Sequence, residues 1–210
     1  MKCVAPTRNW PLRPAETAIL VVDVQASEAT PEALEAAPEY ARALRERMLP
    51  ALTRLVDGAR GEGCEIIYTV IKALTRDGRD RSLDHKLSDI LVPKGSPLGK
   101  TLPEARQQED DIVLPKTSSG VFNSTNIAYL LRNLGIRNVV VAGVLTDQCI
   151  DMAVRDGADL GFYMVCASDA CASKTDARHE QALQAFKGYC RLQTVDEVLA
   201  DVVSAARAAA

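Results

Sequence analysis

The sequence predicts an α/β protein built on a mostly parallel sheet of six strands. Short apolar runs rich in Val and Ile alternate along the chain with longer segments whose apolar residues recur at helical spacing. Strands that alternate with helices form βαβ units, which give parallel sheets with right-handed crossovers. The 210 residues, 47% of them hydrophobic, suffice for one domain over residues 1–210 with a sizeable core.

The first strand is predicted for residues 17–24, TAILVVDV, because a continuous apolar run is typical of a strand that is buried on both faces. Residues 64–71, CEIIYTVI, have the same β-branched character and predict the second strand. The other strands are predicted for residues 111–114, 137–143, 161–167 and 190–193.

A long helix is predicted for residues 38–60, where Leu44, Leu52 and Val56 lie near one face and glycines follow. Further helices are predicted for residues 124–134, for the segment that carries Cys149, and for residues 176–187 and 195–206. Residues 72–108 lack clear periodicity and are rich in glycine and proline. A loop of that length in a compact domain is usually functional.

Charge and composition exclude several classes of protein. The net charge is −3 and the basic residues are scattered, which argues against a nucleic-acid partner or an anionic membrane surface. No segment is apolar enough to span a membrane, and the first six residues do not resemble a signal peptide, so we expect a cytoplasmic protein. Neither a GxGxxG motif after the first strand nor a P-loop is present, so no nucleotide cofactor is expected.

Six cysteines occur, none in a CxxC pair, and we expect no disulfide framework in a chain of this size. Cys149 follows the strand predicted for 137–143, where Thr146 and Asp147 are natural helix caps. A thiol in the first turn of a helix lies near the positive end of the dipole, which favours the nucleophilic thiolate. Alternatively, Cys149 is a small apolar residue that fills a strand–helix junction, and this window alone does not decide.

Asp23 and Lys116 are placed to join Cys149. Ligands of open α/β sheets bind at the carboxyl ends of strands, beside the point where strand order reverses. Asp23 ends the first strand, Cys149 follows the first strand of the second half, and Lys116 follows the strand predicted for 111–114. A cysteine nucleophile needs a base, which a carboxylate can supply, and a lysine stabilises both negative groups. Each residue alone has a simpler structural explanation, but the three together predict a catalytic site.

These motifs resemble the isochorismatase-like cysteine hydrolase family over nearly the whole chain. The resemblance rests on LVVDVQ at 20–25, LPKT at 114–117 with Phe122, AGVLTDQC at 142–149, and Asp169-Ala170 with His179. It implies a three-layer, Rossmann-like fold with helices on both faces of the sheet. It also implies an Asp23–Lys116–Cys149 triad and a cis peptide between Val144 and Leu145. The backbone N–H groups of Leu145 and Cys149 would then bind an oxyanion.

The sequence departs from the family pattern in two places. Family members often have Asn-Asp-Phe after the Asp-x-Gln motif, whereas Gln25 is followed by Ala26-Ser27-Glu28, so the aromatic wall is missing. Nicotinamidases of the family bind a metal through an Asp and two His. Here the two histidines, His85 and His179, are far apart in sequence, so we expect no metal and no other cofactor.

We therefore expect an amidohydrolase that cleaves a C–N bond of a small linear amide, ureido or carbamoyl compound through a thioester, releasing ammonia or an amine. Five residues are candidates for contact with the substrate: Gln25, Arg81, Lys86, Phe122 and Asn123. Structural roles compete with these. Gln25 can orient Asp23 or the sheet edge, Arg81 and Lys86 lie in a charged run, and Asn123 or Ser124 can cap a helix. Members of the family form dimers or tetramers, and the same is expected here.

Three alternatives stay open. The chain can be a catalytically silent binding protein on the same fold, although an intact Asp–Lys–Cys set argues against this. It can be an isochorismatase-like hydrolase of another small substrate. It can also be a thiol redox protein, in which Cys166 or Cys171 approaches Cys149 in space.

Overall fold

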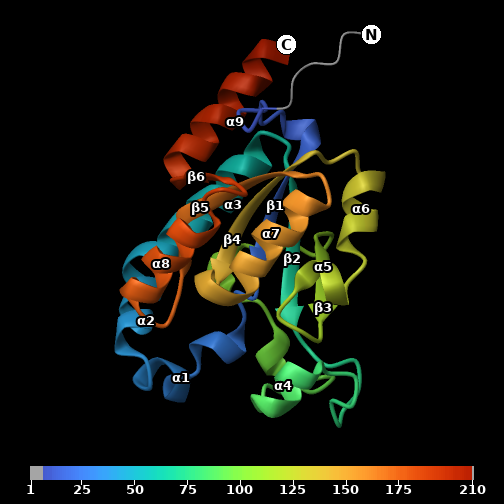
Figure 1. Ribbon diagram of the computed structural model, residues 1–210, viewed down its shortest axis with the longest axis vertical. Coiled ribbons are helices and arrows are strands. Elements are labelled where there is room, and N and C mark those ends of the chain that lie inside the picture. Colours follow the sequence, from blue (N-terminus) through green and yellow to red (C-terminus); the bar gives the residue numbers. More distant parts are fainter. Residues whose placement is uncertain (1–6, 210) are drawn as a thin grey trace.

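The computed structural model describes residues 7–209 (Figure 1), so Cys3 and the segment used to judge a signal peptide lie outside the described residues. One six-stranded parallel sheet has the order β3-β2-β1-β4-β5-β6. The strands are β1 (Thr17–Val22), β2 (Glu65–Ile71), β3 (Ile112–Lys116), β4 (Asn138–Val144), β5 (Tyr163–Ala172) and β6 (Arg191–Gln193). The predicted fold class is confirmed, and strand order reverses between β1 and β4.

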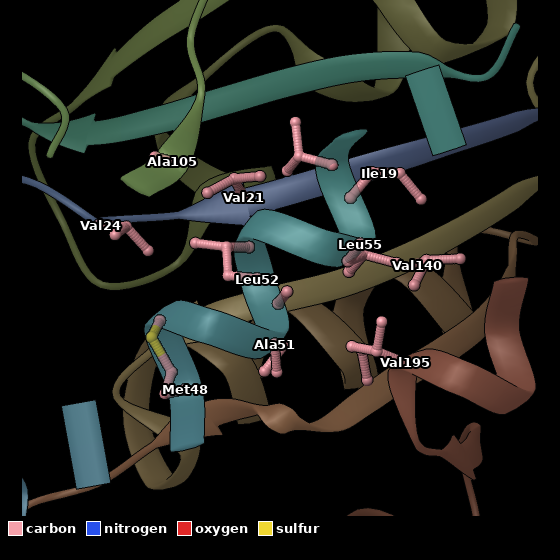
Figure 2. Packing of buried hydrophobic residues seen from close by; sticks show 14 of the residues in the cluster. Ile19, Val21, Val24, Met48, Ala51, Leu52, Leu55, Ala105, Val140 and Val195 are labelled. Carbon is pink, nitrogen blue, oxygen red and sulfur yellow. The ribbon is translucent and has the colours of Figure 1, made fainter. Parts of the chain in front are cut away.

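The two central strands are buried on both faces, as their continuous apolar sequences predict. Every residue of β1 and β4 is buried. Because side chains alternate along a strand, Ile19 and Val21 point into one core and Leu20 into the other. Figure 2 shows Ile19, Val21 and Val140 facing Leu52 and Leu55 in the first core.

One face of the sheet is covered by α2 (Pro38–Ala43), α3 (Leu49–Gly61) and α9 (Val195–Ala209). A π-helical turn, η3 (Leu44–Met48), joins α2 to α3, so the helix predicted for 38–60 is continuous but widened in its middle. Pro50 is the second residue after this turn. Proline has no N–H and clashes with the carbonyl of the preceding turn, and a widened turn relieves that clash.

The other face is covered by α5 (Val121–Ser124), α6 (Ile127–Asn133), α7 (Asp151–Asp159) and α8 (Asp176–Phe186). The single helix predicted for 124–134 is wrong, because the chain is extended at Thr125. The Thr125 hydroxyl donates to the carbonyl of Val121 and accepts from the N–H of Ile127, and such local bonds compete with a helix. The predicted caps at Asn123 and Ser124 are also wrong, since both lie inside α5.

Two strands are longer than predicted, and β1, β2 and β6 are shorter by one or two residues. Strand β3 extends to Lys116, which is therefore its last residue. Strand β5 continues through Ser168 and Asp169 because the register with β4 shifts there, between Val141 and Gly143, so polar residues that suggest a turn form a bulge. Strand β1 ends at Val22.

The segment predicted as a loop, residues 72–108, crosses the carboxyl ends of β1 and β2 and contains α4 (Leu83–Leu87), as the lower part of Figure 1 shows. Ser82 caps α4, accepting from the N–H of His85 at 3.1 Å. The N–H of Leu102 donates to the carbonyl of Val24 at 2.9 Å, which fastens the segment beside the end of β1. None of the helices in residues 7–209 is both long and apolar enough to cross a membrane.

Candidate active site

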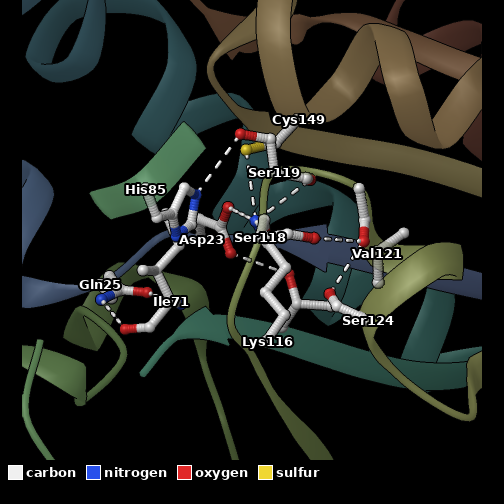
Figure 3. Close-up of polar contacts among 12 residues, drawn as sticks. Asp23, Gln25, Ile71, His85, Lys116, Ser118, Ser119, Val121, Ser124 and Cys149 are labelled. Atoms are coloured by element: carbon white, nitrogen blue, oxygen red, sulfur yellow. Dashed lines mark hydrogen bonds and ion pairs between the residues drawn. The ribbon is translucent and has the colours of Figure 1, made fainter. Parts of the chain in front are cut away.

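Asp23, Lys116 and Cys149 meet at the carboxyl ends of the parallel strands (Figure 3). Asp23 follows β1, Lys116 ends β3, and Cys149 lies in the π-helical turn η6 (Thr146–Ile150) between β4 and α7. The Nζ of Lys116 is 2.8 Å from Oδ2 of Asp23 and 3.3 Å from Sγ of Cys149. The three residues are 1%, 0% and 4% exposed, in chain order. The structure thus brings the three side chains together at one buried point.

The Lys116 ammonium is held from two further directions. Its Nζ donates to the carbonyl oxygens of Ser118 at 2.9 Å and Ser119 at 3.2 Å. Burial alone lowers the pKa of Lys116, but the Asp23 carboxylate and the Cys149 sulfur outweigh it, so the pKa is raised. The lysine is therefore a fixed positive charge between a carboxylate and a thiol.

Asp23 is positioned by a residue that the sequence did not single out. Thr69 of β2 accepts from the Asp23 N–H through its carbonyl, and its hydroxyl donates to Oδ1 of Asp23, both at 3.0 Å. Asp23 itself has a φ of 55°, in the left-handed region that Asp tolerates better than most residues. The signal that could have found Thr69 is a hydroxyl residue near the end of an apolar strand beside β1.

The predicted thiolate at Cys149 is not what the structure favours. Burial, followed by the charge of Asp23, raises the pKa of the Cys149 thiol to about 12, although Lys116 acts in the opposite direction. The resting sulfur is therefore a neutral thiol beside a carboxylate that can accept its proton. A position in the first turn of a helix is too weak to overcome burial of this extent.

The predicted caps before Cys149 are also wrong, because Leu145 is the N-cap and makes no side-chain cap bond. The Thr146 hydroxyl lies 2.8 Å from Nδ1 of His179. Asp147 accepts from Nε of Arg178 at 2.6 Å and also from the hydroxyl of Ser173. These partners lie on β5, on α8 or next to them, so the two residues fasten the Cys149 turn to the neighbouring elements.

Strands β1 and β4, which precede Asp23 and Cys149, approach each other closely at Gly143. Its φ is 126°, and a Cβ there would lie 2.1 Å from the carbonyl oxygen of Val22. Only glycine fits such an approach. The peptide bond between Val144 and Leu145, which directly precedes the Cys149 turn, is cis.

His85, on α4, lies at the edge of the site. It is 1% exposed, and its Nε2 is 3.5 Å from the hydroxyl of Ser119, whose carbonyl binds Lys116 (Figure 3). Burial, and next the charge of Lys116, lower the pKa of His85, so its ring is neutral. No sequence pattern separates this histidine from the charged run around it.

Glu28, Tyr40 and Lys174 form a second polar group near the triad, and the sequence did not predict it. Glu28 lies in the 3₁₀ turn η2 (Ala26–Ala29), and its pKa is raised, first by burial, although Lys174 lowers it. The charges of Asp23 and Lys116 also act on Glu28. Tyr40 is fully buried, and its pKa is raised by burial and then by Glu28 and Asp23.

Two of the candidate substrate contacts are engaged in holding the chain. The Gln25 side chain is buried; its Oε1 accepts from the N–H of Ile71 at 2.6 Å, and its Nε2 donates to Ser27, Ile71 and Leu98. The Arg81 guanidinium donates to the carbonyls of Gly78, His85 and Ile90. Both side chains brace the loops around the site, and we assign them positioning roles.

The other three candidates lie on α4 and α5. Lys86 is exposed on α4, and Asn123 is exposed on α5. Phe122 stacks on Phe162, with 6.0 Å between ring centroids, and packs against the second core. Asn123 lines a pocket together with Ser118 and Ser119, whose carbonyl oxygens accept from Lys116. Substrate contact by these three residues stays a prediction.

Among the described residues, Cys166 and Cys171 lie next to each other on β5. The sulfur atoms of Cys166 and Cys171 are 3.9 Å from each other within β5, whereas that of Cys149 faces Lys116. In the part of the chain that the structure describes, no group of three or more His, Cys, Asp or Glu side chains is arranged to hold a metal ion.

Comparison with known proteins identifies the family of this chain. The model of the isochorismatase domain matches residues 17–200. The chain belongs to the isochorismatase-like hydrolase family. Family members of known name include the ureidoacrylate amidohydrolase RutB of Azorhizobium caulinodans, which is 31% identical over 79% of this chain and 81% of its own length. RutB of Rhizobium rhizogenes is 29% identical, over 79% of this chain and 74% of its own length.

Solved structures share the fold. A cysteine hydrolase from Pseudomonas syringae pv. phaseolicola superposes with a TM-score of 0.84, at 23% identity, over 95% of this chain and 98% of the other. N-carbamoylsarcosine amidase from Thermoplasma acidophilum gives a TM-score of 0.71, at 21% identity, over 86% and 97%. At these identities the likeness establishes the family fold alone.

Proposed function

We propose that this chain is a cysteine-dependent amidohydrolase that cleaves a C–N bond of a small linear amide, ureido or carbamoyl compound. The observation that carries the proposal is the position of the Lys116 ammonium, 2.8 Å from the carboxylate of Asp23 and 3.3 Å from the sulfur of Cys149. Relatives whose names state an amidohydrolase or amidase activity on ureido or carbamoyl compounds support it.

In the first step Asp23 accepts the proton of the Cys149 thiol, and Lys116 stabilises the thiolate that forms. The sulfur attacks the carbonyl carbon of the substrate and forms a C–S bond while the carbonyl oxygen gains negative charge. The N–H groups of Leu145 and Cys149 are the proposed donors to this oxygen. Because Cys149 starts as a neutral thiol, proton transfer to Asp23 is an essential part of the reaction.

In the second step Asp23 returns the proton to the leaving nitrogen, the C–N bond breaks, and ammonia or an amine departs from a thioester on Cys149. Asp23 then accepts a proton from water, and the resulting hydroxide attacks the thioester carbon. The C–S bond breaks and the sulfur regains a proton from Asp23. One buried carboxylate thus serves as base and acid in turn, which requires that Lys116 stay charged throughout.

The test is ammonia release by the purified protein from biuret, ureidoacrylate, N-carbamoyl amino acids, maleamate and nicotinamide, each compared with Cys149→Ala. We expect release from the ureido or carbamoyl compounds and none from the variant. Equal release by the variant would refute the nucleophile. If the native protein releases ammonia from none of these compounds and its Cys149 resists alkylation, a binding protein on this fold is favoured.

A further inference from the structure

Glu28 and Lys174 carry opposite charges but form no hydrogen bond or salt bridge with each other. The charge of Lys174 acts on Glu28 without a hydrogen bond between them, and both side chains are half-buried. The Nζ of Lys174 lies 4.2 Å from the centre of the Tyr40 ring, so the cation rests on the aromatic face. Opposite charges that stay apart at the edge of a buried site leave a donor and an acceptor for a bound molecule.

The hydroxyl of Tyr40 is an unpaired polar group within this arrangement. Tyr40 is 0% exposed, and its hydroxyl has no hydrogen-bond partner among the described residues. A buried hydroxyl without a partner is costly, and native structures retain one where a ligand or a water completes it. Burial, followed by the charges of Glu28 and Asp23, raises the pKa of this hydroxyl, so it stays protonated and can donate to a bound molecule.

Glu28 is held in place by the backbone. Its N–H donates to the carbonyl of Gln25 at 3.0 Å, and Gln25 is itself fixed by the bonds to Ile71 and Leu98. The acid therefore follows Asp23 through a short, braced turn. Glu28 is five residues after Asp23, in the segment where family members often carry a phenylalanine.

We propose that Glu28, Tyr40 and Lys174 bind the part of the substrate beyond the scissile C–N bond and select linear ureido compounds. In this arrangement Glu28 accepts a hydrogen bond from a second N–H of the substrate. Lys174 and the Tyr40 hydroxyl donate to a carbonyl or carboxylate oxygen further along the molecule. An aromatic or purely apolar acyl group offers neither partner and leaves these groups unpaired. The inference rests on the proposed function and names the substrate class for it.

The electrostatic part is tested with two reagents of nearly equal shape, iodoacetamide and iodoacetate. Each forms a C–S bond to Cys149 and expels iodide, but the first presents an amide N–H₂ and the second a carboxylate. Peptide mass spectrometry gives the alkylation rate at Cys149 for each reagent. We compare the native protein, Glu28→Gln, Lys174→Met and, as a matched control, Glu32→Gln, an exposed acid on α1 (Pro31–Glu35).

Removing the Glu28 charge should raise the ratio of the iodoacetate rate to the iodoacetamide rate by roughly tenfold, and removing the Lys174 charge should lower it. Glu32→Gln should leave the ratio unchanged. A ratio in Glu28→Gln equal to that in the control would overturn the inference. Because alkylation needs no turnover, this result judges the three residues even if no amide is hydrolysed.

The substrate part is tested with kcat/KM for ureidoacrylate and for maleamate, which lacks the second nitrogen. Glu28→Gln should lose at least tenfold more activity on ureidoacrylate than on maleamate, and Tyr40→Phe should raise KM without lowering Tm. Equal losses on the two substrates would contradict selection of a ureido N–H. If the native protein hydrolyses neither substrate but the variants change the alkylation ratio as expected, the proposed function is refuted and the inference on these three residues stands.

Discussion

Gly143 and Val22 approach so closely that a Cβ on the glycine would lie 2.1 Å from the Val22 carbonyl oxygen. This contact joins β4 to β1 just before Asp23 and the Cys149 turn. Gly143→Ala should destabilise the protein by about 3 kcal/mol or more, because both a steric clash with backbone and a strained φ are introduced. Urea unfolding measures it. The control is Gly61→Ala, where a Cβ meets nothing within 4 Å. Equal stability of the two variants would contradict the contact.

The Asp23–Lys116 pair predicts non-additive stability. Lys116→Met leaves a buried carboxylate without its partner and should cost about 3–5 kcal/mol, whereas the double variant Asp23→Asn, Lys116→Met should be less destabilised than that single variant. Unfolding curves of the four proteins give the coupling energy. Additive losses would mean that the two side chains do not interact as the 2.8 Å distance indicates.

The raised pKa of Cys149 predicts how its alkylation depends on pH. Since burial shifts this pKa upward to about 12, the thiolate fraction, and with it the rate, should still be rising by about tenfold per pH unit between pH 7 and 9. Iodoacetamide labelling of the Cys149 peptide measures it, with Lys116→Met expected to react more slowly at each pH. A rate that reaches a plateau below pH 8 would contradict the raised pKa and favour the resting thiolate that the sequence alone suggested.

His179 predicts acid sensitivity of the fold. Burial, and next Arg47, lower its pKa to about 4, and Nδ1 of the neutral ring lies 2.8 Å from the Thr146 hydroxyl. The unfolded chain takes up the proton near pH 6.5, so stability falls from that pH downward and levels off below about pH 4. The loss is about 3 kcal/mol. His179→Asn should flatten this slope, and an unchanged slope would assign the effect to other groups.

Features of this protein that follow from the sequence pattern could be predicted, whereas those that depend on individual contacts or on tertiary packing could not. The Val-rich runs of β1 and β4 predict buried parallel strands, because burial on both faces leaves few alternatives. The split at Thr125 was missed because two hydroxyl bonds decide it. The neutral Cys149 thiol was missed because burial depends on what the rest of the chain packs over it.

The same reasoning applies to the candidate site. Asp23, Lys116 and Cys149 could be grouped because each follows or ends a strand of a parallel sheet, and strand ends converge. Glu28 and Tyr40 could not, since their approach to Asp23 depends on a short turn and on how α2 packs. Gln25 was a candidate for substrate binding or for orienting the sheet edge, and its amide bonds to Ile71, the last residue of β2, support the second role.

The most direct test of the central claim is intact-protein mass spectrometry of an acid-quenched turnover reaction with a ureido compound that the protein hydrolyses. The account predicts an acyl adduct on Cys149, heavier than the free protein by the substrate without its leaving amine, and no adduct in Cys149→Ala. Ammonia release that persists in Cys149→Ala, with no adduct on the native protein, would contradict it.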